Sequence, residues 1–386
     1  GLEKRPKLRF PGFDDPWKVF KAEELFQNIT DRNHPDETVL TIIQGKGTLP
    51  REQAGRNIHY DDASLSNYKK VEQGDFIIHL RSFEGGLEMA NEAGIVSPAY
   101  TILRCKRPHS SLFYDAYFHT DEFINHNLSK SVEGIRDGRQ ISYEAFKWLG
   151  IPYCEPTEQE KISTLFSAFN ERIAKQRDLV ESLKKYKRGV NNQILSQIDN
   201  SYNCRLGSVC EIVGGGTPDT LHAEYWGNTV EWFTPSEIGK TKYVNNSVRK
   251  LSDIGLDNSS AKLLPIGTVL LTTRATLGEM SIAKRECSTN QGFQSLIPHT
   301  DRVSSEYLYY MQIIIKPWCE KYASGNTFRE ISKSALSDCI IPIPDRARQE
   351  QIVKLLSSID MIIDAAESIS MSLSKIRHGL MQQLFI

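Results

Sequence analysis

The residue types that usually carry chemistry occur in this chain without the spacing that catalysis needs. Asp15-Pro16-Trp17 is too short to match the Asp-Pro-Pro-Tyr or Asn-Pro-Pro-Tyr motif of amino-methyltransferases. Gly214-Gly215-Gly216 resembles a phosphate cradle, but no lysine follows it and Thr217-Pro218 breaks the approach to a helix. A structural turn is therefore the favoured interpretation of these glycines, and no Gly-x-x-x-x-Gly-Lys-Ser/Thr loop indicates ATP binding.

The histidines and cysteines also lack the spacing of nucleophiles or metal ligands. His119 and His126 are seven residues apart, which is more typical of an ordinary surface pair. The seven cysteines form no Cys-x-x-Cys pair, so neither a zinc site nor a disulfide framework is indicated. We therefore predict no catalytic residue, no bound metal, and reduced cysteines in a cytoplasmic protein.

The remaining notable side chains are arginines that recur at a fixed offset. Gly74 to Ile78 reads as a turn glycine and a buried strand that lead to Arg81, and Gly267 to Leu271 leads to Arg274 at an offset of 193. Nearer the end of each half, Arg139-Gln140-Ile141-Ser142 matches Arg329-Glu330-Ile331-Ser332 at an offset of 190. The chain is therefore a tandem duplication.

The strongest copies of the repeat are residues 151–196 and 341–386. Thirteen of their 46 aligned pairs are identical, whereas chance would give about three. Each copy predicts a long helix with a heptad seam, because the apolar residues alternate in spacings of four and three. The seam positions are Ile162, Phe166, Phe169, Ile173, Gln176, Val180, Leu183, Lys187, Val190 and Ile194, and Ile352, Leu356, Ile359, Ile363, Ala366, Ser370, Leu373, Arg377, Leu380 and Leu384.

Such helices are marginal alone, and each is the natural partner of the other. A helix of about 40 residues spans roughly 60 Å, and a parallel pairing would need an extended return along its whole length. We therefore expect an α/β (α+β) protein with two globular domains at opposite ends of an antiparallel coiled coil. The expected division is a first domain at 1–150, a spacer helix at 151–200, a second domain at 201–340 and a second spacer helix at 341–386.

Composition sets the broad class of the protein. The formal net charge is −1 and charged residues make up 25% of the chain, as in globular proteins. We expect no membrane insertion and no secretion, because the sequence contains no run of 18 apolar residues and no signal pattern. The near-neutral charge argues mildly against nucleic acid unless the basic face is local or partner subunits supply phosphate contacts. The basic cluster of residues 4–9 is more typical of a solvated segment than of a phosphate clamp.

At this point the chain resembles the specificity (S) subunit of a type I restriction–modification system. The resemblance rests on the duplicated order of domain and helix and on the Ile-Pro-x-Pro…Gln-Glu-x-Ile opening of the second helix. It also rests on the Gly-Gly-Gly-Thr-Pro turn, on residues 325–332 (Gly-Asn-Thr-Phe-Arg-Glu-Ile-Ser) and on Pro11-Gly12-Phe13 before Trp17. The first copy departs from this pattern at Cys154 and Pro156 and at residues 133–136.

The resemblance implies that each globular domain recognises one half of an asymmetric, two-part sequence in double-stranded DNA, and that the helices set the unread gap. It implies two modification subunits as partners, which carry S-adenosylmethionine and methylate adenine, with restriction (motor-nuclease) subunits added for cleavage. The chain itself would hold no cofactor and would not be the catalyst.

Under this interpretation arginine is the best candidate for DNA contact, because its fork bonds a guanine edge or a phosphate. Arg81 and Arg274 are either DNA contacts or members of a structural salt bridge present in both copies. Arg139 and Arg329 are identical in both domains, so they favour phosphate positioning or loop structure over base reading. Base readers are expected where residues 31–72 and 217–262 diverge. The candidates are Gln44, Lys46 and Arg51, and Ser236, Lys240, Lys242 and Tyr243.

One alternative remains open at this stage. Duplicated domains at a fixed spacing also suit a tandem adaptor that binds protein or saccharide. Steep weakening of duplex binding with salt would distinguish DNA recognition from apolar docking. A stand-alone enzyme is disfavoured by the missing motifs.

Overall fold

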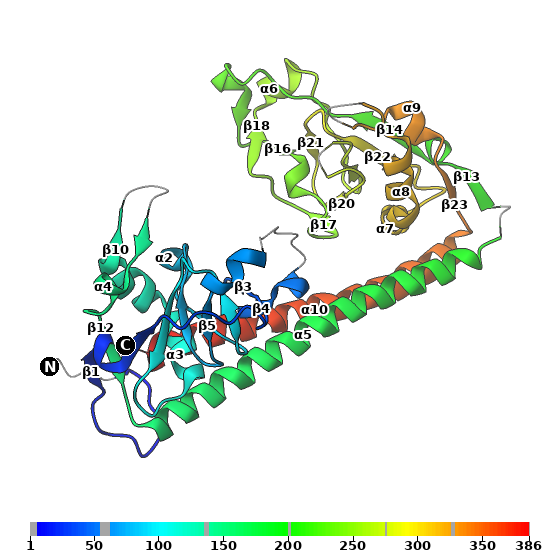
Figure 1. Cartoon of the computed structure of the whole chain (residues 1–386). Coiled ribbons are helices and arrows are strands. Elements are labelled where there is room, and N and C mark those ends of the chain that lie inside the picture. The colour runs from blue at the N-terminus through cyan, green and yellow to red at the C-terminus, as the bar shows by residue number, and fades with distance from the viewer. Residues whose placement is uncertain are drawn as a thin grey trace. The chain divides into compact units, whose positions relative to one another are not determined.

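The computed structural model of the chain describes residues 6–54, 62–134, 139–199, 202–274, 276–325 and 329–385. It is a mixed helix and strand protein with two compact units (Figure 1). Residues 1–178 and 367–386 form the first unit, and residues 179–366 form the second. Each unit thus contains one globular domain together with a part of both long helices. Among the described residues no helix is long and apolar enough to cross a membrane.

An antiparallel sheet in the order β2-β9-β6-β7 organises the first domain. Its strands are β2 (Phe26–Ile29), β9 (Thr101–Cys105), β6 (Phe76–Ile78) and β7 (Glu88–Met89). Paired strands around it are β1 (Lys18–Lys21) with β12 (Gly150–Tyr153), β3 (Leu40–Ile43) with β4 (Gly47–Pro50), β5 (Lys69–Val71) with β8 (Gly94–Val96), and β10 (Val132–Glu133) with β11 (Gln140–Ile141). The short helices are α1 (Ala22–Leu25), α2 (Ser82–Gly85), α3 (Ser111–Phe118) and α4 (Tyr143–Phe146).

Two sheets organise the second domain. The first has the order β14-β22-β19-β20-β17, with β14 (Cys210–Gly214), β22 (Gln294–Pro298), β19 (Val269–Leu271), β20 (Met280–Ala283) and β17 (Tyr243–Val244). The second has the order β15-β18-β16-β21, with β15 (Trp226–Gly227), β18 (Arg249–Leu251), β16 (Val230–Phe233) and β21 (Cys287–Thr289). Also present are the pair β13 (Asn203–Arg205) and β23 (Ile340–Pro342), and helices α6 (Asp253–Asp257), α7 (Ser305–Tyr310), α8 (Gln312–Tyr322) and α9 (Lys333–Ser337).

The duplication extends to the register of the central strands. Phe76 lies opposite Leu103 between β6 and β9, and Val269 lies opposite Leu296 between β19 and β22. Each member of the second pair is 193 positions after its counterpart, which is the offset that relates the sequences. The pair Ile77 and Glu88 corresponds in the same way to Leu270 and Ser281. The two domains are therefore built on one scaffold, as the sequence predicts.

Each predicted spacer segment begins with a short strand before its helix. Helix α5 covers Pro156–Ser196 and α10 covers Arg346–Leu384, so each begins five residues after the predicted segments at 151 and 341. The intervening residues include most of β12 and β23, and carbonyl groups of these two strands accept hydrogen bonds from the domains. The tyrosine hydroxyls of Tyr114 and Tyr307 donate to the carbonyls of Pro152 and Pro342, at 3.2 and 2.9 Å.

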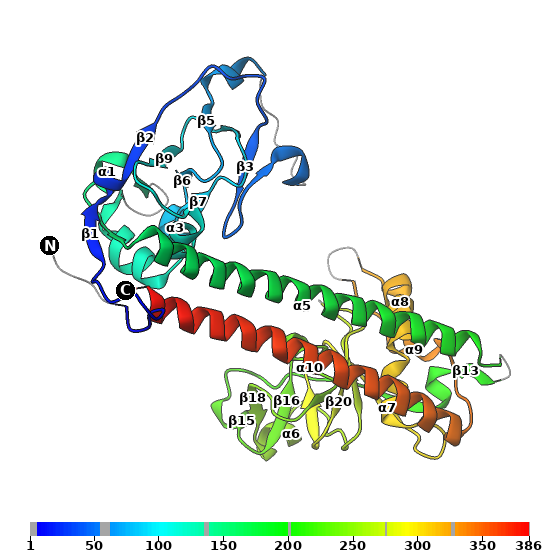
Figure 2. The same ribbon diagram turned by 90° about the horizontal axis from the view of Figure 1, so that it is seen from below.

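The two helices pack in opposite directions within each unit. In the first unit the start of α5 lies beside the end of α10 (Figure 2), and Ile162 and Phe166 share a core with Leu384 and Phe385. In the second unit Ile194, near the end of α5, shares a core with Ile352 and Leu356, near the start of α10. None of the twenty predicted seam positions is exposed. The antiparallel heptad seam is therefore confirmed.

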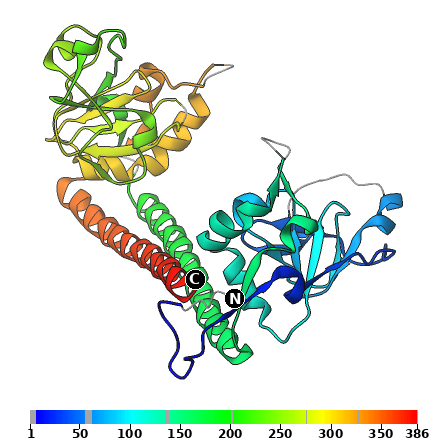
Figure 3. The same ribbon diagram turned by 90° about the vertical axis from the view of Figure 1, so that its left-hand side faces the viewer.

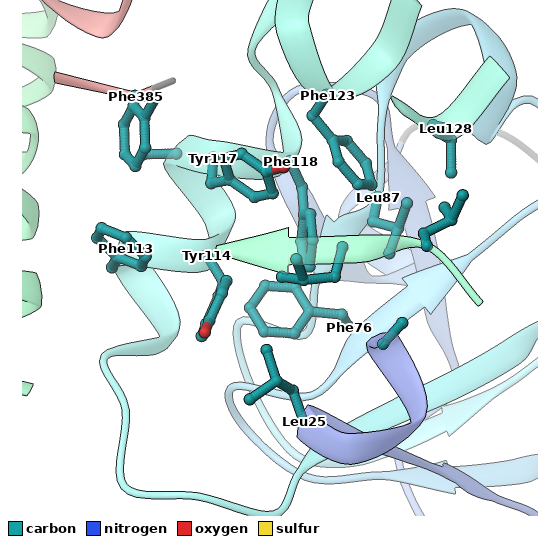
Figure 4. Close-up of a cluster of buried hydrophobic side chains, with 14 of the residues drawn as sticks. Leu25, Phe76, Leu87, Phe113, Tyr114, Tyr117, Phe118, Phe123, Leu128 and Phe385 are labelled. Carbon is teal, nitrogen blue, oxygen red and sulfur yellow. The ribbon is translucent and has the colours of Figure 1, made fainter. Parts of the chain in front are cut away.

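Aromatic rings join the end of α10 to the first domain. Phe385 packs against Phe113 at 5.2 Å and against Phe166 at 5.8 Å between ring centroids. Tyr114 and Phe118 extend this cluster to Phe76 of strand β6 (Figure 4). The N-terminal segment lies alongside, because the Leu8 amide donates to the Gln383 carbonyl at 3.0 Å (Figure 3). The first domain and the helices of its unit thus share one hydrophobic core.

Arg9 corrects part of the prediction for the basic cluster. Its guanidinium donates to both carboxylate oxygens of Glu158, in the first turn of α5, at 2.9 and 2.8 Å. The ring nitrogen of Trp17 donates to the same carboxylate at 3.1 Å. The interpretation as a solvated residue is therefore wrong for Arg9, because a buried acid holds it. Lys4 and Arg5 lie outside the described residues.

A buried glutamine ties each long helix to its domain in the same way. The side-chain amide of Gln159 donates to the Cys154 carbonyl at 2.8 Å, and its oxygen accepts the amide N–H of Ser110 at 3.0 Å. The amide of Gln349 donates to the carbonyls of Pro344 and Arg302, and its oxygen accepts the N–H of Ser304 at 3.2 Å. Ser110 and Ser304 are the N-caps of α3 and α7. One side chain thereby positions two helices.

Substitution of Gln349 by alanine should destabilise the second unit by about 3 kcal/mol, because three buried or partly buried backbone hydrogen bonds are lost. Denaturant unfolding of the full chain measures this loss. Gln193→Ala removes an exposed glutamine from the same class of helix and should change the free energy of unfolding by about 0.5 kcal/mol or less. Equal unfolding midpoints for the two variants would contradict this role of Gln349.

Candidate nucleic-acid interface

The β3–β4 hairpin presents two of the predicted DNA-contacting side chains, Gln44 and Lys46. The Lys46 amide closes the turn by donating to the Ile43 carbonyl at 2.9 Å. Gly45 and Gly47 have φ values of 73° and 76°, a left-handed conformation that glycine adopts without strain. At Gly47 any side chain would also collide, since a Cβ would lie 2.5 Å from the Met89 carbonyl. The side chains of Gln44 and Lys46 are exposed.

A buried carboxylate supports this turn. Glu88 is fully buried, and its two oxygens accept the amides of Gly45 at 2.6 Å and Gly47 at 2.9 Å. The side-chain amide of Asn91 holds the other side of the turn by donating to the carbonyls of Lys46 and Thr48 at 2.8 and 2.9 Å. The backbone on each side of Lys46 is therefore fixed, while its side chain is not.

His119 is the basic partner of Glu88. Its Nε2 lies 3.3 Å from the Glu88 carboxylate and its Nδ1 lies 2.7 Å from the Asp115 carbonyl oxygen. Both neighbours only accept hydrogen bonds, so the doubly protonated ring is the form that satisfies both. Burial lowers the pKa of His119, but the bond to Glu88 and the charge of Asp115 outweigh burial and raise it to about 8. Burial raises the pKa of Glu88, whereas His119 and the two amides lower it, and the net direction is down.

Helix α2 brings the other first-domain candidates together. Gln44 packs on Gly85, where a Cβ would lie 2.0 Å from its side-chain nitrogen. Arg81 is exposed at the N-cap of α2, and the guanidinium of Arg139 lies 4.3 Å from the ring centroid of Phe83. Arg51 is separate from this group, at the far end of β4, where it lies 5.9 Å from the ring of Tyr68.

The repeated arginines make different contacts in the second domain. Arg274 forms an ion pair with Glu330 at 2.7 Å, so the structural salt bridge is present there. The position equivalent to Glu330 is Gln140, and among the described residues no carboxylate pairs with Arg81. Arg329 donates to the carbonyls of Glu320 and Ala323, at the end of α8. The salt bridge is thus not shared by the two copies.

A second acid-supported turn presents Ser236. The turn η9 (Pro235–Glu237) is closed by Glu237, which accepts the amide of Thr234 at 2.8 Å and its hydroxyl at 2.7 Å. The other oxygen of Glu237 accepts the Val248 amide at 2.8 Å. Ser236 is exposed and its hydroxyl lies 3.1 Å from that of Thr234. Gly239, with φ of 84°, then leads into exposed Lys240.

Lys242 is directed into the second unit. Its ammonium donates to the hydroxyls of Tyr310 and Ser357, both at 3.0 Å. Burial lowers its pKa. The Tyr310 hydroxyl in turn donates to Asp360 at 2.7 Å, and Asp360 pairs with Lys187 at 2.5 Å. These contacts tie Lys242 to both long helices rather than to the surface.

Tyr243 and the glycine run complete the second-domain candidates. The Tyr243 hydroxyl donates to Glu306 at 3.4 Å, and Lys284 lies 4.5 Å from its ring centroid. Gly216 donates to the Thr289 carbonyl at 2.8 Å and accepts the ring N–H of Trp232 at 3.0 Å. Its amide and carbonyl are thus occupied within the domain. Gly214 is the last residue of β14 and irregular chain follows it, so these glycines end a strand instead of forming the predicted turn. Among the described residues no group of three histidine, cysteine or acidic side chains could hold a metal ion.

Sequence reasoning missed Glu88, Asn91 and His119, because single polar residues far apart in the chain give no periodic signal. It also missed a second apolar row on the long helices, although the spacing was visible. Exposed apolar residues lie seven apart along α10 and occupy the matching repeat positions at Leu179 and Tyr186 of α5. The α10 residues are Leu355, Ile362, Ile369 and Ile376, with exposed fractions of 47%, 55%, 48% and 52%.

These features define a class: a tandemly duplicated protein with two similar domains, each built around part of an antiparallel helix pair. Residues 199–373 match the family described as Type I restriction modification DNA specificity domain. The type I restriction enzyme MjaIX specificity subunit of Methanocaldococcus jannaschii is 34% identical over 186 residues, which are 47% of this chain and 43% of that protein. The EcoR124I/EcoR124II specificity subunit of Escherichia coli is 24% identical over 259 residues, 63% of each chain.

The fold agrees over nearly the whole chain. A chain solved in a study of complex assembly and conformational transition of the type I R-M system has a TM-score of 0.61 and 19% identity, covering 97% of this chain and 98% of that one. The type I S subunit from M. genitalium has a TM-score of 0.55 and 15% identity, with 99% of each chain covered. The chain is therefore similar in sequence to type I restriction–modification specificity subunits over part of its length, and it shares the fold of a solved type I S subunit over nearly its whole length. The sequence matches span less than two thirds of the two curated relatives.

The first unit should lose stability as the pH rises through the pKa of His119. The folded pKa is about 8 and the unfolded value about 6.5, so protonation of His119 stabilises the folded state fully below about pH 6.5. Up to about 2 kcal/mol is lost above pH 8. Unfolding midpoints across this range measure the loss. His119→Gln should flatten it, whereas His126→Gln, at an exposed ring, should not. An unchanged pH slope in His119→Gln would contradict the assignment.

Proposed function

We propose that the chain is the DNA-recognition subunit of a type I restriction–modification complex, in which each domain recognises one half of an asymmetric bipartite site. The observation that carries this proposal is the shared register of the two domains beneath different exposed turns. A common scaffold with divergent surfaces suits two readers of different sequences. It is not required for a scaffold that binds one ligand twice.

The exposed side chains have the chemistry that reading a duplex needs. Glutamine can bond both edge positions of an adenine, and arginine and lysine bond guanine or phosphate. We propose Gln44 and Ser236 as base contacts, with Tyr243 beside them in the second domain. Arg81 precedes the short helix α2 of the first domain and Arg139 lies against Phe83 of that helix, where both suit phosphate positioning. Arg51, Arg274 and Arg329 remain candidates, and Lys242 holds its domain to the helices rather than reading bases.

The catalytic work belongs to partners in this proposal. Two modification subunits would carry S-adenosylmethionine and methylate adenine, and restriction subunits would join for cleavage. The chain itself would supply recognition and assembly. Because its formal net charge is −1, the partner subunits would supply phosphate contacts. That the helices set the length of the unread gap stays a prediction.

The second apolar row supports a helical partner for each long helix. Single exposed apolar residues are common, but a repeat of seven on helices is the pattern that packs against another helix. Leu179 and Tyr186 of α5 match Ile369 and Ile376 of α10, which suits two copies of one partner, whereas Arg172 stands at the position of Ile362. We propose that the modification subunits pack against these rows.

Domain exchange tests the division of labour. Replacement of residues 10–150 by those of a relative should change one half of the methylated sequence, because the second domain is untouched. Replacement of residues 201–340 is the matched control and should change the other half. Mapping methylated adenines in host DNA measures both. A methylated sequence that is unchanged in either exchange would refute the proposal, and duplex binding insensitive to salt would favour the adaptor alternative.

Assembly should depend on the second apolar row. Glu substitution of Leu355 and Ile362 together should abolish co-purification with the modification subunits, since two charges would be placed in an apolar interface. The helix itself should stay folded, because both positions are about half exposed. Lys354→Glu, at an exposed position of the same helix, should assemble normally. Normal assembly of the double variant would remove this surface from consideration.

A further inference from the structure

The segments around Lys46 and Lys240 are equivalent, although they lie where the two halves of the sequence diverge. A buried carboxylate supports the first and a buried hydroxyl supports the second. Glu88 of β7 and Ser281 of β20 occupy the same position of the duplicated sheet, opposite Ile77 and Leu270. Both side chains are fully buried. Each reaches out of the sheet to the backbone of a turn that contains an exposed lysine.

The lysine is bracketed in the same way in each domain. Glu88 accepts the amides of Gly45 and Gly47, one residue before and one after Lys46. The Ser281 hydroxyl accepts the Gly239 amide at 3.2 Å and donates to the Thr241 carbonyl at 2.7 Å, again on each side of a lysine, Lys240.

The residue before each lysine is a left-handed glycine. Gly45 has φ of 73° and Gly239 has φ of 84°, so each lysine follows a left-handed glycine although the flanking sequences are unrelated. Lys46 and Lys240 are both exposed. Among the described residues neither lysine forms an ion pair, whereas Lys70, Lys147, Lys250 and Lys316 do. The protein thus holds two ammonium groups in matched positions and leaves both available.

A side chain that is identical in two domains with different targets cannot distinguish those targets. A duplex offers one charged group that is the same in every half-site, the phosphate. Lysine binds phosphate as a point charge from a compact ammonium group. We propose that Lys46 and Lys240 form a duplicated phosphate-binding turn, one in each domain, with Glu88 and Ser281 as the positioning residues. This proposal rests on DNA recognition and reassigns both lysines from base reading to backbone contact.

The two domains share one scaffold but use different anchoring residues, Glu88 and Ser281, beneath their lysines. A carboxylate spans two amides, whereas a hydroxyl spans an amide and a carbonyl, so the turns can be matched in position while their sequences vary. Gln44 in the first domain and Ser236 in the second then project beside a fixed phosphate contact. The lysines would set where each domain sits on the backbone, and the neighbouring side chains would read the bases.

The test measures duplex binding by the complete complex with its modification subunits, over a range of salt concentrations. Lys46→Ala and Lys240→Ala should each weaken binding to cognate and scrambled duplexes by the same factor, roughly threefold to tenfold. Each should reduce the slope of log affinity against log salt by about one, and the double variant by about two. Preference among single-base changes in each half-site should stay as in the parent complex. Lys130→Ala and Lys262→Ala, at exposed lysines outside the turns, are the matched controls and should leave the slope unchanged.

The roles of Glu88 and Ser281 are tested by combining their substitutions with the lysine substitutions. Glu88→Gln keeps the size of the side chain but leaves one amide facing an NH₂ group, and Ser281→Ala removes the hydroxyl without adding bulk. Each should reduce the salt slope like the lysine variant of its own domain, and should add little when combined with that variant, because both changes remove one contact. Additive effects would show that the anchors act independently of the lysines and would overturn their assignment. Ser281→Ala keeps this test informative if Glu88→Gln does not fold.

The possible outcomes distinguish a failure of the phosphate-binding turns from a failure of DNA recognition itself. A parent complex without salt-dependent duplex binding would refute DNA recognition itself. A parent complex that binds as expected, with lysine variants that retain the full slope, would refute only the phosphate-binding turns. A lysine variant that alters base preference in its half-site would also refute them, and would restore that lysine as a base reader.

Discussion

The structure depends on one repeated joint, the buried glutamine at the start of each long helix. A helix N-terminus leaves backbone groups that must find partners, and so does the N-terminus of α3 or α7. The side-chain amides of Gln159 and Gln349 provide partners at both places. The oxygen accepts the N–H of the residue that caps the domain helix, and the nitrogen donates to a carbonyl just before the long helix. Because an unsatisfied buried amide is costly, this geometry admits little variation. The domain is therefore fixed to the helix that follows it, and the same joint serves both halves.

The two units use this joint with different supporting contacts. In the first unit a cluster of aromatic rings, Trp17, Phe113 and Phe385, joins the domain to the end of α10. In the second unit a polar network of Lys242, Tyr310, Asp360 and Lys187 joins the domain to both helices. Arg377 occupies the repeat position of Lys187, and burial lowers its pKa. Lys187, a charged residue in the heptad seam, thus contacts both Asp360 of α10 and the Tyr310 ring of the second domain, since the helices bind a domain as well as each other.

The sequence predicted the framework well because its signals are local and repeated. Heptad spacing marked every buried seam position, and the offset of 193 marked strands whose registers match residue for residue. The long helices were predicted to start too early in the chain, because Pro152 and Pro342 belong to short strands. The strands that pair with them, β1 and β13, lie far away in the chain and give no local signal there. The DNA-contacting residues stay predictions. Divergence between the halves selected residues that are exposed, such as Gln44, but it also selected Lys242, which contacts Tyr310 and Ser357, since divergence also occurs where a domain meets the helices.

The anchors beneath the turns could not have been found from one sequence. Glu88 and Ser281 differ in size, charge and donor capacity, so alignment of the two halves presents them as an unremarkable mismatch. Only strand register shows that they occupy one position and serve one turn. The Gly-Lys pairs at 45–46 and 239–240 were hidden for a related reason, because an offset of 194 differs from the offset of the flanking strand. A buried residue that varies between copies can therefore preserve an exposed one, by adapting its own chemistry to a loop whose length and sequence have changed.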